Sequence, residues 1–351
     1  MKISRLFFDE LGPLGTQEIS LLNDWDDSIE SRALFTGPNG CGKSTVLRAV
    51  AKLWEAAGYW LDQRKVLPQK NSPREWLQLW GGCAVLIEGL PYLDQPLGLF
   101  FGEQTWCEQL HNQHPEICWL GETISRTGKP GAPKRELHLP SGQWLERWAE
   151  ARRKLILTFE KSAWPNVIYL DAEERRWVTP KRGVGEPKPD DSGLRWLPRY
   201  VASDDWKGQL EASLITLKTS QLHTYHSVIR QLNAFLSGKE IDPDIKPGDN
   251  RLRVKLKGQR GQSHLLDDLS AGEHQVLILI YLLARWAEEG CVVLIDEPDL
   301  YLHPSLTSGM LASLEQIVAE KQGQLLITSH QPDIWQRYEA VGKRIELGFE
   351  G

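Results

Sequence analysis

One segment constrains the fold of this chain more than any other: residues 37–45, which read Gly-Pro-Asn-Gly-Cys-Gly-Lys-Ser-Thr. They fit the pattern G-x-x-x-x-G-K-[ST], in which glycines let the backbone turn tightly so that successive N–H groups point at phosphate oxygens. An apolar run at 33–36 precedes the segment, and apolar residues at helical spacing follow it over 44–57. Strand, glycine loop and helix is the context that the motif needs, so the pattern predicts a phosphate-binding loop (P-loop) rather than a glycine turn with a stray lysine.

The side chains of the P-loop predict how a nucleotide and its metal ion are held. We expect Lys43 to reach the β- and γ-phosphates and the Ser44 hydroxyl to bind Mg²⁺. The N-terminus of the following helix adds a partial positive charge aimed at the same phosphates. The predicted phosphate-binding residues are Gly37, Asn39, Gly40, Cys41, Gly42, Lys43, Ser44 and Thr45.

A second motif, Cys-Val-Val-Leu-Ile-Asp-Glu-Pro at 291–298, places two carboxylates after an apolar run. The run does not alternate, which is typical of a strand buried on both faces of a parallel sheet. Buried charges are costly unless they are paired or bind metal. We therefore expect Asp296 to hold Mg²⁺ and Glu297 to act as a general base on the attacking water. The alternative is that the two carboxylates merely form an acidic turn after the strand.

Two further segments complete a pattern. Leu-Ser-Ala-Gly-Glu at 269–273 precedes an apolar helix over 276–287, and Thr-Ser-His at 328–330 follows an apolar strand over 325–327. Ser270 and Glu273 have the spacing of a capping box, so the first segment taken alone predicts only a helix N-terminus.

The order of these four motifs resembles the ABC-type ATPase superfamily. The run Glu-Pro-Asp-Leu-Tyr-Leu-His-Pro at 297–304 looks like the Glu-Pro-Glu-x-x-Leu-His-Pro stretch of the soluble OLD, RecF and SMC-like branch. The resemblance covers roughly residues 1–56 and 265–350. Ala271 replaces the glycine that is commoner in the family signature, a change that keeps the space for a phosphate.

The resemblance implies a role for each matching residue. Ser270, Gly272 and Glu273 would be signature residues that bind the γ-phosphate of an ATP held by the opposite subunit. His330 would contact the same phosphate and act with Glu297 in catalysis, with Asp296 and Ser44 as ligands of the metal. The implied cofactors are ATP and Mg²⁺. The glutamine of the family's Q-loop and the residue that contacts adenine have no assignment in this sequence.

The predicted fold class is α/β: a P-loop NTPase of ABC type with a large α+β insertion between the P-loop helix and the signature. We assign residues 1–60 and 265–351 to the ATPase domain and 61–264 to an inserted arm or lid, parts of which complete the ATPase sheet. Within the insertion we expect strands at 83–89, 97–101 and 166–170, helices at 143–161 and 210–236, and a loop at 177–195. Proline and glycine interrupt it too often for a long coiled coil.

The resemblance predicts a soluble ATPase that works as a homodimer with two ATP molecules between its subunits. Its compact form resembles the ATPase subunits of bacterial anti-phage or anti-plasmid defence systems, which act with a separately encoded effector protein. A DNA-repair ATPase is the alternative. A transporter subunit would have a shorter insertion, and a scaffold that does not hydrolyse ATP would not need Glu297.

Composition limits the compartment and the partners. The five cysteines form no paired framework, which indicates a reducing, cytoplasmic location. The longest apolar run, 276–284, is far shorter than the ~20 residues that span a bilayer, and residues 1–10 are too acidic for a signal peptide. The net charge of −6 argues against a generally basic surface for nucleic acid.

Three features of the insertion keep two interpretations each. Cys107, His111, His114 and Cys118 have zinc-capable spacing, but a buried helical stripe has the same spacing. Arg251, Arg253, Lys255 and Lys257 alternate with apolar residues, as either a solvated strand face or a strip that contacts nucleic-acid phosphates. After the strand at 166–170, Arg175 or Arg176 either approaches the nucleotide or a partner, or belongs to a surface salt-bridge cluster.

Overall fold

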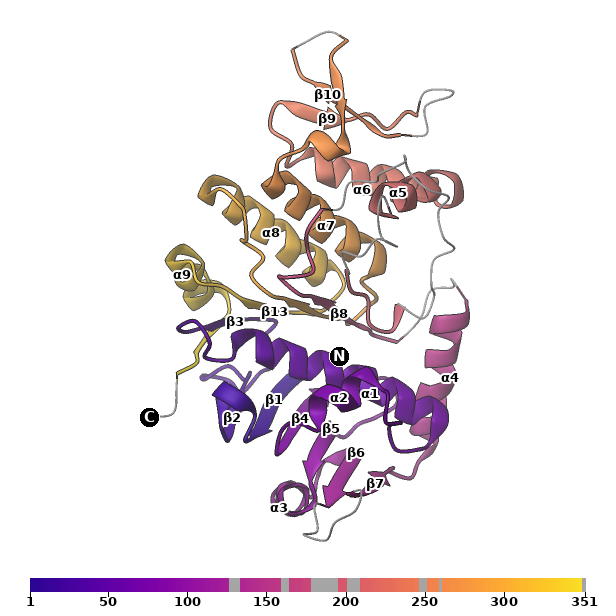
Figure 1. Cartoon of the computed structure of the whole chain (residues 1–351), viewed down its shortest axis with the longest axis vertical. Helices are drawn as coiled ribbons and strands as arrows, with labels where there is room; N and C mark the ends of the chain where they lie inside the picture. The colour runs from indigo at the N-terminus through magenta and orange to yellow at the C-terminus, as the bar shows by residue number, and fades with distance from the viewer. Residues whose placement is uncertain are drawn as a thin grey trace.

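The computed structural model describes residues 1–125, 133–158, 164–177, 195–200, 209–245, 251–258 and 261–348. Its described part forms two large sheets with one long helix between them and a layer of helices on the far side (Figure 1). A small sheet lies at the end opposite the N-terminal sheet. This arrangement confirms the predicted α/β class.

The central sheet is parallel and has five strands in the order β14-β3-β13-β12-β8. Its strands β3, β8, β12 and β13 are apolar runs buried on both faces, as the sequence predicts for a parallel sheet. Because the strands are parallel, their carboxyl ends meet at one edge. The bounds are β3 Arg32–Thr36, β8 Val167–Leu170, β12 Val292–Ile295, β13 Gln324–Thr328 and β14 Lys343–Glu346.

The second sheet has six strands in the order β2-β1-β4-β5-β6-β7, and only β5 and β6 run parallel. It joins the N-terminal strands to strands of the predicted insertion, so the two segments share one sheet. The strands expected at 83–89 and 97–101 are confirmed as β4 and β5. The bounds are β1 Lys2–Asp9, β2 Gln17–Ser20, β4 Gly82–Glu88, β5 Leu97–Glu103, β6 Cys118–Ser125 and β7 Lys134–His138.

Helix α1 (Lys43–Gln63) starts at the P-loop and lies between the two sheets (Figure 1). Its apolar side chains enter one core with residues from both sheets. The Trp54 ring stacks on Trp196 with centroids 4.4 Å apart, and each indole donates to the other residue's carbonyl at 2.9 Å. Trp148 of α4 (Gln143–Leu157) packs against both rings, so these buried tryptophans stabilise the core.

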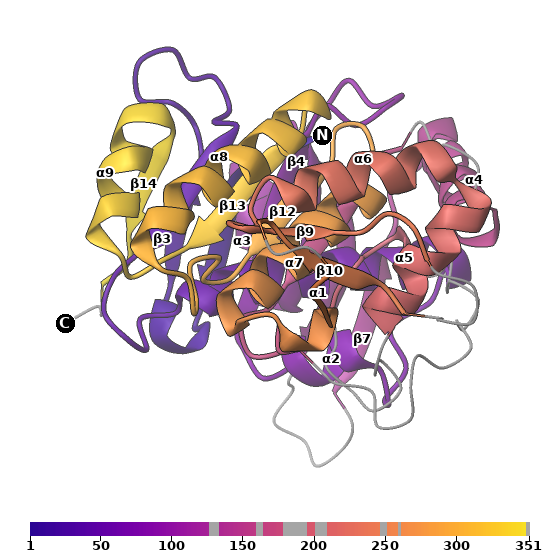
Figure 2. The ribbon, with the colours of Figure 1, turned by 90° about the horizontal axis from the view of Figure 1, so that it is seen from above.

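The helical layer covers the other face of the parallel sheet, as Figure 2 shows from above. It contains α5 Gln209–Ser220, α6 Leu222–Asn233, α7 Ala271–Trp286 and α8 Pro304–Glu320. The small sheet has the order β11-β10-β9, with bounds β9 Lys239–Ile241, β10 Arg253–Leu256 and β11 Ser263–Leu265. The remaining helices are α2 Ser72–Leu77, α3 Gln104–Gln113 and α9 Pro332–Val341, with 3-10 turns at Gly12–Leu14 and Leu266–Asp268.

Two expectations about the helices need correction. The single helix predicted at 210–236 is wrong: α5 and α6 are separate, and Gln221 between them has φ −144° and ψ 67°. The hydroxyls of Thr219 and Ser220 bond back to the Thr216 carbonyl, a competition with the backbone that favours helix ends. Helix α4 ends at Leu157; residues 159–163, and nearly all of the predicted loop at 177–195, lie outside the described residues.

Candidate active site at the edge of the parallel sheet

The P-loop leaves β3 and turns into α1 through residues in left-handed backbone conformations. Gly42 has φ +99°, and a Cβ there would lie 2.7 Å from the Leu14 side chain. Lys43 is buried, and its ammonium donates to the carbonyls of Gly37 and Pro38 at 3.0 and 2.9 Å. The Lys43 ammonium thus lies over the loop and is bound only by neutral carbonyls in these two contacts. Because carbonyls do not neutralise it, its positive charge remains available to an anion. Cys41 is fully buried, consistent with a small residue that fills the loop.

A buried carboxylate faces the first turn of α1. Asp296 Oδ1 accepts from the Ser44 hydroxyl at 3.0 Å and from the Thr328 hydroxyl at 2.6 Å. Asp296 follows β12, and Thr328 ends the neighbouring β13. Carboxylate and hydroxyl oxygens are the ligands that Mg²⁺ prefers, so Ser44 and Asp296 fit the predicted metal pair.

Glu297 and His330 lie next to this group. Their Oε1 and Nε2 atoms are 3.3 Å apart, and the side chains are 31% and 39% exposed, so water can reach both. Glu297 has φ +45°, an unusual conformation for a residue other than glycine. Its N–H donates to the Thr328 hydroxyl at 2.9 Å, which fixes this strained backbone beside the Asp296 carboxylate.

Arg175 lies at the site, where one of its two interpretations from the sequence placed it, but its contacts were not predicted. It is fully buried, and its guanidinium donates to the carbonyls of Leu170, Asp296 and Glu297 at 2.8, 2.6 and 2.7 Å. Burial lowers the pKa of Arg175 to about 10, against the nearby carboxylates. The interpretation that Arg175 belongs to a surface salt-bridge cluster is therefore wrong. Arg176, in contrast, is exposed at the surface.

Asp171 occupies the same edge at the end of β8. Its carboxylate accepts from the Tyr169 hydroxyl at 2.6 Å and from Arg48 of α1 at 3.1 Å. Burial opposes its charge, but these partners hold the pKa of Asp171 below its usual value. For Asp171 and Arg175, the only signal in the sequence was a charged run after an apolar strand.

Among the described residues, the signature residues share no hydrogen bond or ion pair with this group. The capping box is confirmed: Glu273 accepts from the Ser270 N–H and hydroxyl, and its own N–H donates to the Ser270 oxygen. A Cβ at Gly272 would lie 2.9 Å from the Tyr301 carbonyl oxygen, which explains a glycine in this helical position. Within the described residues, no hydrogen bond or ion pair joins 270–273 to the P-loop.

The zinc interpretation gains no support. Among the residues described, no group of three or more His, Cys, Asp or Glu is placed to hold a metal ion. His111 packs between Trp119 and Phe100, with centroids 4.8 and 4.7 Å away, and burial lowers its pKa to about 4. Cys107 is buried, which raises the pKa of its thiol. Only Cys107 and His111 lie on α3, whereas His114 follows that helix and Cys118 begins β6, so the predicted single helical stripe is also wrong.

The basic strip is partly engaged inside the molecule. Its alternation is confirmed, because Leu252 and Val254 are fully buried. However, Arg251 pairs with Glu211 and Asp267 at 2.9 and 2.6 Å, and Lys255 pairs with Asp242 at 2.8 Å. At least two of the four cations are thus bound to carboxylates, which weakens the phosphate-strip interpretation.

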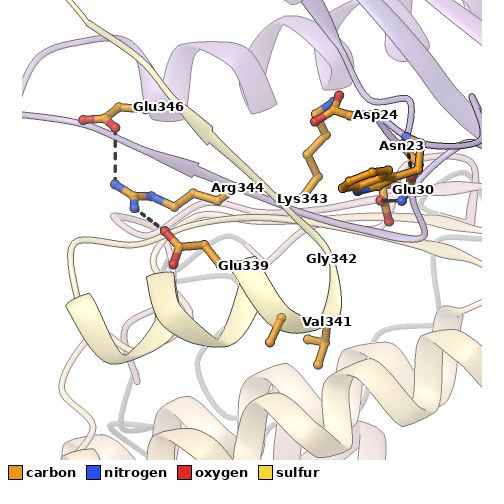
Figure 3. Close-up of a pocket in the computed structure, with 11 residues that line it drawn as sticks. Asn23, Asp24, Glu30, Glu339, Val341, Gly342, Lys343, Arg344 and Glu346 are labelled. Atoms are coloured by element: carbon orange, nitrogen blue, oxygen red, sulfur yellow. Dashed lines mark hydrogen bonds and ion pairs between the residues drawn. The ribbon is translucent and has the colours of Figure 1, made fainter.

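A separate polar pocket of about 660 Å³ lies between the loop after β2, α9 and β14 (Figure 3). Lys343 pairs with Asp24 at 2.7 Å, and Arg344 pairs with Glu339 at 2.6 Å. Because its cations are neutralised by its own carboxylates, this pocket is a poorer anion site than the P-loop.

The sheet order, the helix between two sheets and the residues at the carboxyl edge together define an ABC-type P-loop ATPase fold. Comparisons with known proteins agree. Residues 171–334, which contain the signature, Asp296, Glu297 and His330, match the family described as "AAA domain, putative AbiEii toxin, Type IV TA system". The match covers somewhat less than half of the chain.

Three other similarities extend this comparison. A segment of 133 residues, 38% of the chain, is 34% identical to protein ea59 of Escherichia phage lambda and spans 25% of that protein. An SMC head bound to the C-winged helix domain of ScpA has a TM-score of 0.50 at 12% identity, covering 95% of this chain and 90% of that one. An SMC head domain from Thermotoga maritima covers 99% and 94% at 14% identity, with a TM-score of 0.44.

The chain therefore has the fold of an ABC-type P-loop ATPase, similar to that of an SMC head. None of the helices in the described ranges combines the length and apolarity needed to cross a membrane.

Proposed function

We propose that the chain hydrolyses ATP, with Lys43, Ser44, Asp296, Glu297 and His330 as the core of the site. The observation that carries this proposal is that these residues meet at one edge of the sheet. Ser44 Oγ lies 3.0 Å from Asp296 Oδ1, and His330 Nε2 lies 3.3 Å from Glu297 Oε1. Bound Mg²⁺, held by Ser44 and Asp296, would neutralise charge that develops on the phosphates.

The residues divide the work. The P-loop amides and Lys43 bind the phosphates, and the water-accessible Glu297 carboxylate takes a proton from the attacking water. His330 would align that carboxylate, because its Nε2 lies 3.3 Å from Glu297 Oε1. Thr328 holds both the Asp296 side chain and the Glu297 backbone, so the metal ligand and the base keep a fixed relation.

We further propose that two copies form the complete site. In the described part of their own chain, Ser270, Gly272 and Glu273 form no hydrogen bond or ion pair with the P-loop, and a second copy would bring them to the nucleotide. The biological role that we favour is the ATPase subunit of a bacterial defence system with a separately encoded effector, an idea supported by the family's description as a toxin–antitoxin component. DNA repair remains the alternative role, and neighbouring genes would distinguish the two.

Two variants test hydrolysis. Lys43→Ala should lose productive phosphate binding, whereas Glu297→Gln should bind ATP normally and turn it over about 10²–10⁴-fold more slowly, the usual contribution of a positioned base. Phosphate release and binding of a fluorescent ATP analogue measure the two effects. The role of Glu297 is refuted by a Glu297→Gln protein that releases phosphate at the wild-type rate.

A further inference from the structure

The signature of this chain ends in a carboxylate, which is an unfavourable group beside a phosphate. Glu273 lies in the first turn of α7, where the resemblance places the phosphate tail of a nucleotide from the other subunit. Two negative charges a few ångströms apart repel each other, and more strongly where water is partly excluded. The site therefore needs a compensating cation near Glu273.

The three-stranded sheet supplies that cation. Lys239 of β9 donates from its ammonium to both Glu273 oxygens, at 2.9 and 2.8 Å. Burial alone would raise the pKa of Glu273, but the hydrogen bonds from Lys239 and Ser270 outweigh it and hold that pKa below its usual value. Glu273 is thus ionised, and Lys239 neutralises it.

The backbone holds Lys239 in this position. Lys239 lies opposite Leu256 of β10 in the antiparallel strand pair, and the Lys239 backbone N–H donates to the Leu236 carbonyl at 3.3 Å. The start of α7 is itself held in place, since the Trp177 ring stacks on His274 at 4.2 Å and the Trp177 indole donates to Asp267 at 2.8 Å. Lys239 is thus placed by the fold and is not a mobile surface side chain.

We propose that Lys239 is part of the nucleotide site: by neutralising Glu273, it lets the phosphate tail of a nucleoside triphosphate bound to a second copy approach Ser270. The inference rests on the proposed function, in which two copies share the site. The Ser270 hydroxyl now donates to Glu273 at 2.9 Å. Because Lys239 keeps the carboxylate neutralised, that hydroxyl can turn to a phosphate oxygen without leaving Glu273 unpaired.

The experiment measures dimerisation of the full chain carrying Glu297→Gln, with ATP and Mg²⁺, by analytical ultracentrifugation. Adding Lys239→Ala should raise the dimer Kd about tenfold or more, as expected when one partner of a charge pair in an interface is removed. Lys239→Arg, which keeps the cation, should dimerise like the background protein. ATP-analogue binding to the separate monomers should change by less than about twofold, because the P-loop is intact.

Lys218→Ala is the matched control. Lys218 lies in α5, has nearly the same exposed fraction as Lys239 (25% against 26%) and pairs with Asp244 rather than with α7. It should leave the dimer Kd unchanged. An equal effect of Lys218→Ala and Lys239→Ala would overturn the inference.

A rescue separates charge from structure. Glu273→Gln removes the charge that needs neutralising, so Lys239→Ala with Glu273→Gln should dimerise within about threefold of the background protein. If the double variant stays as weak as Lys239→Ala while Glu273→Gln alone dimerises normally, the neutralising role is wrong. If the background protein itself fails to dimerise with ATP, the shared site and this inference both fall.

Discussion

At the residue scale, Arg175 connects three parts of the site through one side chain. Its guanidinium binds the carbonyls that end β8 and follow β12, including that of Glu297. Its Nε also donates to Gln275 of α7 at 3.1 Å, and the Gln275 amide bonds back to the Arg175 carbonyl. The backbone of the proposed base and the signature helix are thus held by the same residue.

This geometry predicts that Arg175→Lys impairs the positioning of Glu297. A lysine keeps the charge but lacks the planar fork that reaches several carbonyls at once. We expect kcat to fall about tenfold or more, with KM for ATP changed by less than about threefold, because the P-loop is not touched. Steady-state kinetics of phosphate release measure both constants.

Arg195→Lys is the control for a merely structural effect. Arg195 is also buried and also binds backbone carbonyls, those of Leu155 and Thr158 at 3.2 and 2.6 Å, but it lies in the core around α4. Its replacement should lower the melting temperature while leaving kcat per folded molecule unchanged. A parallel loss of kcat in both variants would count against a positioning role for Arg175.

The same residues show how far a single sequence reaches. The P-loop and the Asp296–Glu297 pair were predictable because each is a contiguous motif whose chemistry depends on local spacing. The contacts of Arg175 and Thr328 were not, because they depend on strands distant in sequence coming together at one edge. Burial of an arginine against carbonyls leaves no pattern in the chain.

At the element scale, two helical glycines differ in what surrounds them. At Gly272 in α7, an added Cβ would meet the Tyr301 carbonyl at 2.9 Å, whereas at Gly309 in α8 the nearest atom would be 4.0 Å away. Alanine favours a helix over glycine by about 1 kcal/mol, so the surroundings decide the sign of each substitution.

We therefore predict opposite shifts in thermal stability. Gly309→Ala should raise the free energy of unfolding by about 0.5–1 kcal/mol. Gly272→Ala should lower it, because the loop at Tyr301 must move or α7 must tilt. Differential scanning calorimetry of the two proteins checks the prediction, and equal stabilisation of both would show that the loop at Tyr301 yields without cost.

Element prediction also had a physical limit. The buried parallel strands were found because each is an uninterrupted apolar run. The division of 210–236 into α5 and α6 was missed, since a polar Thr-Ser-Gln step is also compatible with an exposed helix surface. The pairing of β1 with β4, about 80 residues apart, depends on contacts that no local pattern encodes.

At the scale of the whole molecule, the arrangement of the signature predicts an ATP-dependent dimer. Ser270 is exposed at the start of α7, so Ser270→Arg should place a bulky cation in the proposed interface. We expect it to abolish ATP-dependent dimerisation of the Glu297→Gln protein while ATP binding to the monomer persists. Light scattering with and without ATP measures the effect.

Ser270→Ala controls for the helix cap. Both substitutions remove the capping hydroxyl and should cost about 1 kcal/mol of stability, but only arginine adds bulk. Full activity in a protein that stays monomeric at every concentration would contradict the shared site.

The parallel sheet also determines when the nucleotide site forms during synthesis. In the described part of the chain, strand β3, which leads into the P-loop, pairs with β13 and β14, and the 287 residues 37–323 separate the end of β3 from the start of β13. At about 5–20 residues per second, a ribosome needs roughly 15–60 s to make that interval. Throughout this time the nascent chain carries a P-loop sequence without the neighbouring strands that shape it. An mRNA truncated before β13 would thus yield a chain whose P-loop lacks the strands that flank β3.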